Sequence, residues 1–308
     1  MVGYLAARTG GAVVVLAAIT LFVAFGIRLT GDPAVALFGG AGAPSRQDIE
    51  RIHHAMGTDR PFIVQYGTFL ARAVHGDLGV SFRSGQPVTA LIADRARATL
   101  LLAIGGMVVA LAIAFPLGVY AAMHRDAVTD FLIRVASLLG LSFPNFWLGI
   151  MLILILAVRL RWFPPSGDAG PVSLVLPSVT LGVILASTLV RLVRAALLDA
   201  LGQPYIRTAR AKGLRELRVV VRHGLRNALL PVVTFVGLQF GALLGGVVVL
   251  ENVFAWPGLG QLALQAVSYR DYPVVQGVVV VLAVGIVLVN LLVDLSYGLL
   301  NPRVRVAS

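Results

Sequence analysis

The sequence predicts an all-α, polytopic membrane protein, and three observations predict this fold class. Apolar residues make up 58% of the 308 positions and charged residues only 13%, and the mean hydropathy is +0.90. Six uncharged runs reach the scale of about 20 helical residues that the hydrocarbon core of a bilayer requires. A strongly basic loop separates two of these runs, which is typical of the cytoplasmic side of membrane proteins. We therefore expect six transmembrane helices that account for most of the chain.

The six uncharged runs define the predicted spans. They cover residues 10–27, 98–123, 135–158, 169–190, 227–250 and 272–293. Within them no Asp, Glu, Lys or His lies near a midplane, and the carboxylates of Glu251 and Asp294 lie only at boundaries. Each run is therefore compatible with a helix that crosses lipid.

The basic loop at residues 194–226 determines the predicted topology. It contains eight lysine and arginine residues against two carboxylates, Asp199 and Glu216. Because short cytoplasmic loops are enriched in Lys and Arg, we place this loop and both termini in the cytoplasm. The predicted organisation is a cytoplasmic end with the first span at 1–29, an extracytoplasmic domain at 30–97, a core of five spans at 98–300 and a cytoplasmic tail at 301–308.

The first apolar run has a second interpretation as a cleaved signal peptide. Arg8 precedes the run, and residues 34–36 and 41–43 have the small-residue pattern of a cleavage site. An uncharged run of 18 residues is long for a signal peptide, whose apolar region has about 7–15 residues. The length favours a retained helix, whereas cleavage would leave five spans and an outer N-terminus.

Local signals predict two helices in the outer domain. Ser45 and Asp48 form a helix cap, and Gly57 is placed to end that helix. Pro61 is placed to open a second helix that stops near Gly76. Residues 39–42 are predicted to form a loop, and residues 84–87 a turn before the helix of the second span.

The basic loop contains a short predicted helix. Pro204 suits the first turn of a helix, and Gly213 suits the left-handed residue just past a helix end. The helix at 204–212 would be about 13 Å long, which is too short to cross a bilayer but long enough to fill a groove on a partner. We interpret it as a docking element.

The segment after Gly213 is predicted to be an amphipathic helix. Apolar residues recur at helical spacing beside a parallel basic stripe, and the two sets are Leu214, Leu217, Val221 and Leu225, and Arg215, Arg218, Arg222 and Arg226. One interpretation is a docking surface for a protein partner. The other is a helix on anionic lipid, and the two are compatible.

Small and polar residues mark the last two spans. Gly237, Gly241 and Gly245 form a seam that allows close helix packing, against another span or a second subunit. Gln239 and Asn290 are polar groups within spans and need partners there. They are candidates for lining a translocation path, with ordinary interhelical hydrogen bonds as the alternative.

Missing motifs exclude several function classes. The chain lacks the G-x-x-x-x-G-K-[ST] nucleotide loop, because the motif requires Ser or Thr after its lysine and Lys212 is followed by Gly213. It has no cysteine for disulfides or thiolate metal sites. Adjacent His53 and His54 would point about 100° apart on a helix, which suits a shared metal poorly. The net charge of +11 has no aromatic-rich basic surface beside it, so we expect no nucleic-acid partner. No catalytic residue, metal or cofactor is predicted in this chain, and the lack of midplane charges disfavours a gradient-driven carrier.

Several motifs carry a family resemblance along nearly the whole chain. They are YIRTARAKGL at 205–214 with HGLRNALLP at 223–231, ENVFAWPGLG at 251–260 with RDYPVVQG at 270–277, and, less specifically, DRP at 59–61, GDLG at 76–79 and SFP at 142–144. The chain resembles the inner-membrane permease subunits of ATP-binding-cassette (ABC) importers, specifically the B-type permeases of dipeptide and oligopeptide systems. The first pair of motifs looks like their cytoplasmic EAA loop.

The resemblance implies a type I ABC importer permease fold in a bacterial inner membrane. The implied partners are a second, similar permease, two cytoplasmic ATPase subunits that hold ATP and Mg²⁺, an extracytoplasmic peptide-binding protein and membrane lipid. The implied activity is import of di- and oligopeptides. A nickel or glutathione importer shares this architecture and stays an alternative, as does, from another class, a gradient-driven secondary transporter.

The resemblance also implies roles within the basic loop. Tyr205, Ala209 and Leu214 would contact the ATPase, with Gly213 as the turn. The cationic residues of the short helix would pair with ATPase carboxylates or stay solvated, and they are Arg207, Arg210 and Lys212. Arg207 stands at the family's glutamate position and Thr208 replaces the first alanine, a variant that peptide-type members share.

A second loop, at residues 251–260, is expected at the outer end of the fifth span. Its Pro257-Gly258 turn suggests a re-entrant loop that faces the binding protein, with Glu251 and Phe254 as further candidates. A rigid connector between the last two spans is the alternative.

Overall fold

The computed structural model describes residues 2–37 and 45–300, and every regular element among them is a helix, which confirms the all-α class. An isolated pairing of Val80 with Pro87 is the sole β-bridge in this part of the chain. Contacts divide the chain into two compact units. Among the described residues, unit 1 comprises those up to 99 with 257–288, and unit 2 comprises 100–256 with 289–300.

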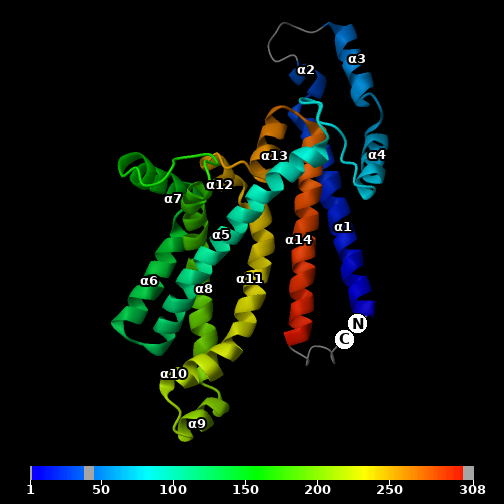
Figure 1. Cartoon of the computed structure of the whole chain (residues 1–308). Coiled ribbons are helices and arrows are strands. Elements are labelled where there is room, and N and C mark those ends of the chain that lie inside the picture. The colour runs from blue at the N-terminus through cyan, green and yellow to red at the C-terminus, as the bar shows by residue number, and fades with distance from the viewer. Residues whose placement is uncertain (1, 38–44, 301–308) are drawn as a thin grey trace. The chain divides into compact units, whose positions relative to one another are not determined.

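Unit 1 combines the N-terminal elements with α13 and most of the last helix (Figure 1). Its elements are α1 (Val2–Gly26), the 3-10 helix η1 (Ile27–Thr30), α2 (Pro33–Leu37), α3 (Arg46–Met56), α4 (Phe62–Val74), the start of α5 (Val88–Met123), α13 (Leu259–Ser268) and α14 (Tyr272–Leu300) as far as 288. Its core includes Ile27, Leu78, Val88, Leu259 and Val278. The described part of the predicted outer domain, 30–37 and 45–97, lies within this unit.

The helix signals of the outer domain are confirmed. The Ser45 hydroxyl accepts a hydrogen bond from the Asp48 N–H at 3.2 Å, and Gly57 ends α3 with a φ of +67°. Pro61 caps α4, and Gly76 follows that helix with a φ of +81°. These signals operate within one turn of the chain, so the sequence alone resolves them. The predicted loop at 39–42 lies outside the described residues.

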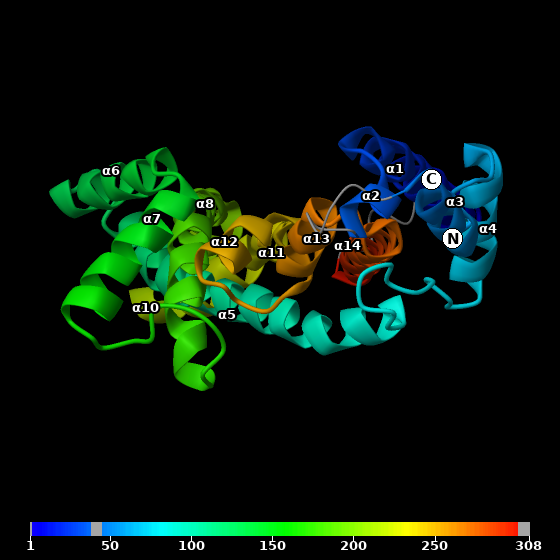
Figure 2. The same cartoon turned by 90° about the horizontal axis from the view of Figure 1, so that it is seen from above.

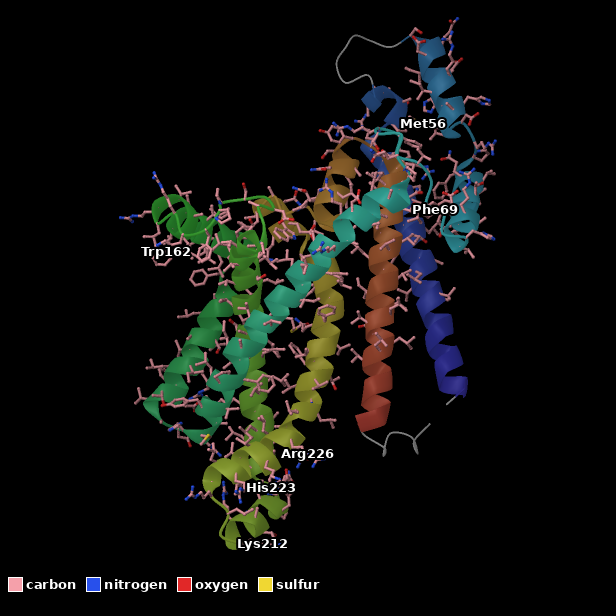
Figure 3. The ribbon with its side chains drawn as sticks, in the orientation of Figure 1. Met56, Phe69, Trp162, Lys212, His223 and Arg226 are labelled. Atoms are coloured by element: carbon pink, nitrogen blue, oxygen red, sulfur yellow. The ribbon has the colours of Figure 1, made fainter. Side chains whose placement is uncertain are left out.

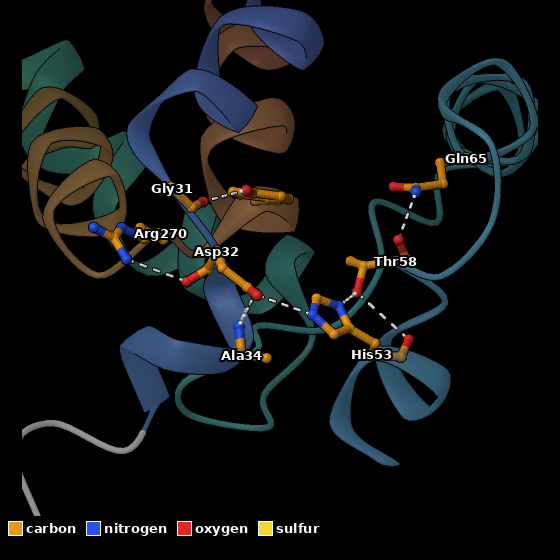
Figure 4. A network of polar contacts seen from close by, with 8 residues as sticks. Gly31, Asp32, Ala34, His53, Thr58, Gln65 and Arg270 are labelled. Atoms are coloured by element: carbon orange, nitrogen blue, oxygen red, sulfur yellow. Dashed lines mark hydrogen bonds and ion pairs between the residues drawn. The ribbon is translucent and has the colours of Figure 1, made fainter. Parts of the chain in front are cut away.

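Unit 1 also contains a pocket of about 640 Å³, to which Met56 of α3 and Phe69 of α4 contribute (Figure 3). A polar network beside it joins the chain before α2 to the end of α3 and to the α13–α14 turn (Figure 4). His53 Nε2 lies 3.0 Å from an Asp32 carboxylate oxygen and its Nδ1 lies 2.6 Å from the Thr58 hydroxyl. Arg270 donates to the Asp32 carbonyl at 3.3 Å. The neighbouring His54 binds a different carboxylate, that of Asp59.

A second polar anchor in unit 1 holds the turn that precedes α5. The Asp271 carboxylate, 4% exposed, accepts hydrogen bonds from the Ser81 hydroxyl at 2.5 Å and from the backbone N–H of Phe82 at 3.1 Å. Gly85 lies within this turn with a φ of +68°, which confirms the predicted turn at 84–87. The anchor links positions about 190 residues apart in the sequence.

Unit 2 is built around α8 (Val175–Leu201), which is buried along most of its length. The helices α6 (Val128–Ser142) and α11 (Arg226–Gly246) pack along α8, and α7 (Asn145–Leu152) contacts α8 and α12 (Val248–Val253) (Figure 2). The remaining elements are the π-helix η2 (Ile153–Arg159), η3 (Pro171–Leu174), α9 (Pro204–Ala211), α10 (Glu216–Arg218) and the π-helix η4 (Val219–Leu225), with the continuations of α5 and α14.

Glycines allow α5 and α8 to approach closely in unit 2. A Cβ added at Gly106 would lie 2.5 Å from a methyl carbon of Leu181, and one added at Gly182 would lie 2.5 Å from Val109. Such distances are too short for two carbon atoms, so only the missing side chains permit this crossing.

The predicted third span at 135–158 is not one continuous helix. The chain bends by 98° between α6 and the following helix, at Phe143 and Pro144. Phe143 is extended, with φ −90° and ψ +131°, because a residue that precedes proline is disfavoured in the helical region. A proline at this point ends one helix and opens another.

The number of spans is supported in part. Among the described residues four helices are long and apolar enough to cross a membrane, at 88–123, 171–201, 216–246 and 272–293, and the bent pair would be a fifth. The apolar helix described for the first run, Val13–Leu29, is shorter than each of these four helices. The count of six, and the side of the membrane that each segment faces, stay predictions.

Candidate functional site

The short helix of the basic loop forms as predicted, as α9. Pro204 occupies its first turn after an extended Gln203, and the helix ends at Ala211 with Lys212 as the cap. Gly213 follows with a φ of +74°, and its N–H donates to the Arg210 carbonyl at 2.9 Å. Proline at the start and left-handed glycine at the end bound this helix within one residue of the predicted 204–212.

Helix α9 rests on a small core of its own. Ile206 and Val219 are fully buried there, Ala209 is 7% exposed, and Leu201 and Leu214 pack against them in part. Ala209 therefore supports the helix from within, which corrects the expectation that its side chain contacts a partner. Leu214 is half-buried in the same way. The exposed surface of α9 comprises Tyr205, Arg207, Thr208, Arg210 and Lys212.

One cation of this surface is bound by the chain itself. The Arg210 guanidinium forms a two-pronged ion pair with Glu216, with nitrogen–oxygen distances of 2.6 and 3.1 Å. The hydrogen bond to Glu216 raises the pKa of Arg210 above its ordinary value. The pair crosses the turn at Gly213 and holds α9 against α10. Arg207 and Lys212 are exposed beside it.

A hydrogen bond connects Tyr205 to the start of α11. The Asn227 amide donates to the Tyr205 hydroxyl at 2.7 Å, and it also donates to the His223 carbonyl at 3.3 Å. Figure 3 shows His223 and Arg226 at the base of α11 and Lys212 near the end of α9. Sequence reasoning did not identify this tie, because the two partners are 22 residues apart.

The apolar residues predicted to share one face of the following helix do not form the face that packs on the chain. Leu217 and Val221 are 66% and 52% exposed, whereas Val219 and Val220 are buried. Residues 219–225 form a π-helix between α10 and α11, and its i→i+5 hydrogen bonds shift the register that a 3.6-residue period assumes. The basic loop is also shorter than expected, since α8 continues to Leu201.

A buried ion pair anchors the end of α8. Asp130 on α6 is fully buried and accepts from Arg194 at 2.6 and 2.7 Å, with the Arg134 guanidinium 3.6 Å away. Arg194, which the sequence places in the basic loop, lies on α8 and is 18% exposed. The available signal was a carboxylate, Asp130, that lies within the first turn of a mostly apolar helix. The pair joins α6 and α8 where the chain leaves toward α9.

The two path candidates lie on neighbouring helices of unit 2. Gln239 on α11 and Asn290 on α14 are both half-buried. The Asn290 amide oxygen would lie 3.1 Å from a Cβ added at Gly241, and Val293 would lie 2.2 Å from one added at Gly237. Gly237 and Gly241 of the seam therefore pack against α14 of the same chain. This contact favours helix packing for Asn290, and a path role for either residue stays a prediction.

The loop at 251–260 is largely buried. Glu251 is fully buried and Phe254 is 2% exposed. A Cβ at Gly149 would lie 3.1 Å from the Phe254 ring, and the Phe254 carbonyl accepts from the Gly167 N–H at 2.8 Å. The expectation that these two side chains face a partner is wrong for the described chain, because both pack inside unit 2. Gly258 is buried and Pro257 half-buried, and the choice between a re-entrant loop and a connector stays a prediction.

The chain matches two family models. Residues 114–306 match the inner membrane component of binding-protein-dependent transport systems. Residues 1–103 match the N-terminal part of the membrane component of such systems.

The sequence is also similar to curated proteins over nearly its full length. It is 42% identical over 306 residues to the glutathione transport system permease protein GsiC of Escherichia coli O6:H1 strain CFT073, and covers 99% of both chains. It is 39% identical over 337 aligned residues to the dipeptide transport system permease protein DppB of Escherichia coli K12, again with 99% of both covered.

A solved structure shares the fold. A chain of the MetNI methionine ABC transporter, in an inward-facing conformation, matches with a TM-score of 0.57 and 21% identity. The match covers 68% of this chain and 96% of that one.

Proposed function

Because the chain belongs to the family of binding-protein-dependent transport system inner membrane components, we propose that it is the permease subunit of an ATP-driven importer for di- and oligopeptides. Members of this family are transport subunits rather than catalytic enzymes. The chain would form half of the translocation path, and partner subunits would hydrolyse ATP, since the sequence lacks a nucleotide loop.

The observation that carries the proposal is the construction of α9. A helix of eight residues stands on its own core, is held by the Arg210–Glu216 pair and exposes Tyr205, Arg207 and Lys212. A rigid, cationic projection of this kind fits an acidic groove on an ATPase subunit. Movement of the ATPase would then reach α8 through Leu201 and α11 through the Tyr205–Asn227 hydrogen bond.

The complete assembly would contain a second, similar permease, two ATPase subunits, an extracytoplasmic binding protein and membrane lipid. The location would be a bacterial inner membrane with both termini in the cytoplasm. Short peptides are supported as substrates by the dipeptide permease among the relatives. Glutathione is the second candidate because a relative at 42% identity is a glutathione permease. Uptake of labelled dipeptide, competed with glutathione, separates these two substrates.

The proposal is tested by charge reversal on α9 followed by copurification. We expect the tagged chain, purified in mild detergent, to bring a second permease and ATP-hydrolysing subunits with it. The double variant Arg207→Glu/Lys212→Glu should lose most of the ATPase and keep the second permease, because only the α9 surface is repelled. The control is Arg46→Glu/Arg51→Glu on α3, which makes the same charge change on exposed residues and should retain both partners.

The opposite result would be recovery of the chain alone, or with copies of itself, in a detergent that keeps known importers intact. Transport that persists without any ATPase subunit would favour a gradient-driven carrier. Retention of ATPase by the α9 variant would place the docking surface elsewhere.

A further inference from the structure

A groove of about 680 Å³ lies beside α9, at the base of α11 in unit 2. Its lining divides into a polar half and an apolar half. The polar residues are Tyr205, Arg222, His223, Arg226 and Asn227, and the apolar residues are Leu229, Leu230 and Val233.

The groove extends from the charged residues at the base of α11 to apolar residues further along that helix. Arg222 at the π-helix and Arg226, Leu229, Leu230 and Val233 on α11 line the groove together. The helix from Glu216 to Gly246 is long and apolar enough to cross a membrane, and its sequence is uncharged from Asn227 onward. The two arginines therefore lie where this helix leaves the hydrocarbon, and Val233, 43% exposed, lies within it.

The cations of the groove differ from the other arginines of this region. Arg194 and Arg210 each bind a carboxylate of the chain. Among the side chains that the structure describes, no carboxylate forms an ion pair with Arg222 or Arg226, and both arginines are exposed. The Tyr205 hydroxyl accepts from Asn227, so its own O–H remains a donor. Two guanidinium groups and a hydroxyl thus face the groove as donors.

We propose that this groove binds an anionic phospholipid. The headgroup phosphate would lie between Arg222 and Arg226 with the Tyr205 hydroxyl as a further donor, since guanidinium groups bind phosphate oxygens strongly. The acyl chains would lie along Leu229, Leu230 and Val233. A free phosphate would gain nothing from this apolar surface, whereas a lipid at a basic patch beside a membrane helix gains from both halves. The bound lipid would brace α9 through Tyr205, at the junction with α11.

The test is a titration of phosphatidylglycerol into the purified, delipidated complex in detergent. Binding is followed by native mass spectrometry and by the thermal unfolding midpoint, with phosphatidylcholine and inorganic phosphate as parallel probes. We expect phosphatidylglycerol to be retained and to raise the midpoint, and the other two probes to have little effect. Arg222→Gln/Arg226→Gln should weaken phosphatidylglycerol binding about thirtyfold.

The matched control is Arg215→Gln/Arg218→Gln. It removes the same charge from exposed positions of the same segment, but neither residue lines the groove, so phosphatidylglycerol binding should stay within about twofold of the unmodified complex. Leu229→Gln should weaken lipid binding while the arginines remain.

Three results would overturn the proposal. Equal losses in the two double variants would indicate non-specific attraction of lipid to a basic helix. An equal effect of inorganic phosphate would indicate an anion site with no role for the acyl chains. Loss of a protein partner from Arg222→Gln/Arg226→Gln, with lipid retained, would indicate that the groove is a protein interface.

Discussion

Gly213 illustrates how a single residue shapes the basic loop. Its φ of +74° lies in the left-handed region, where a side chain costs about 1 kcal/mol. An added Cβ would meet nothing within 4 Å, so the requirement concerns the backbone and not the space around it. The N–H of Gly213 also closes the end of α9 by its bond to Arg210.

We predict that Gly213→Pro abolishes coupled transport and leaves membrane insertion intact. Proline holds φ near −65° and has no N–H, so both the turn and the bond to Arg210 are lost. Gly213→Asn should keep most of the activity, because asparagine tolerates the left-handed region. Peptide uptake in vesicles, normalised to the inserted protein, checks both variants, and unchanged uptake by the proline variant would contradict the role of α9.

Helix caps, which depend on neighbouring residues, were predictable from the sequence, whereas the burial of individual side chains was not. The caps at Ser45, Gly57 and Gly213 each depend on atoms within one helical turn. Ala209 and Glu251 were assigned to exposed surfaces, and the structure buries both. Their burial depends on residues outside their own turn, such as Val219 beneath Ala209, which no local pattern encodes.

At the scale of elements, the Asp130–Arg194 pair joins α6 to α8. Both carboxylate oxygens of Asp130 accept hydrogen bonds from Arg194, and Asp130 has no exposed surface. Removing one partner of a buried pair leaves an uncompensated charge, whereas replacing both with apolar residues of similar volume is often tolerated.

We predict that Asp130→Asn destabilises the protein by about 3 kcal/mol and lowers its thermal unfolding midpoint in detergent. The double variant Asp130→Leu/Arg194→Met should recover most of this loss, because no buried charge remains. Asp199→Asn, a similar change near the end of α8 outside the pair, serves as the control. A double variant as unstable as the single one would mean that the pair is not the source of the effect.

The break between α6 and α7 shows a limit of hydropathy alone. The run 135–158 is uncharged throughout and mostly apolar, so its composition predicts one span. The Phe143-Pro144 step contained the contrary signal, since proline opposes a helical conformation in the residue before it. The register shift by the π-helix at 219–225 had no comparable marker in the sequence.

At the scale of the whole chain, Asp271 joins distant segments within unit 1. Its carboxylate holds the turn at Ser81 and Phe82, about 190 residues earlier. Because the accepting oxygens are buried, loss of the carboxylate leaves donors in the turn without a partner.

We predict that Asp271→Ala destabilises unit 1 by about 2–3 kcal/mol and exposes the turn at 80–87 to protease before the rest of the chain. Limited proteolysis with mapping of the first cut measures this effect. Asp94→Ala, an exposed carboxylate on α5 of the same unit, should leave the pattern unchanged. A first cut at the same place in both variants would contradict the anchoring role.

The sequence by itself determined the membrane class, the helical fold and the bounds of α9. These features depend on composition, on periodicity and on residues within one turn of each other. Only the tertiary structure decided that Arg194 binds Asp130, that Asn290 packs on the Gly241 seam and that Glu251 and Phe254 are buried. Each of these depends on contacts between segments far apart in the chain, and such contacts exist only after the helices have packed.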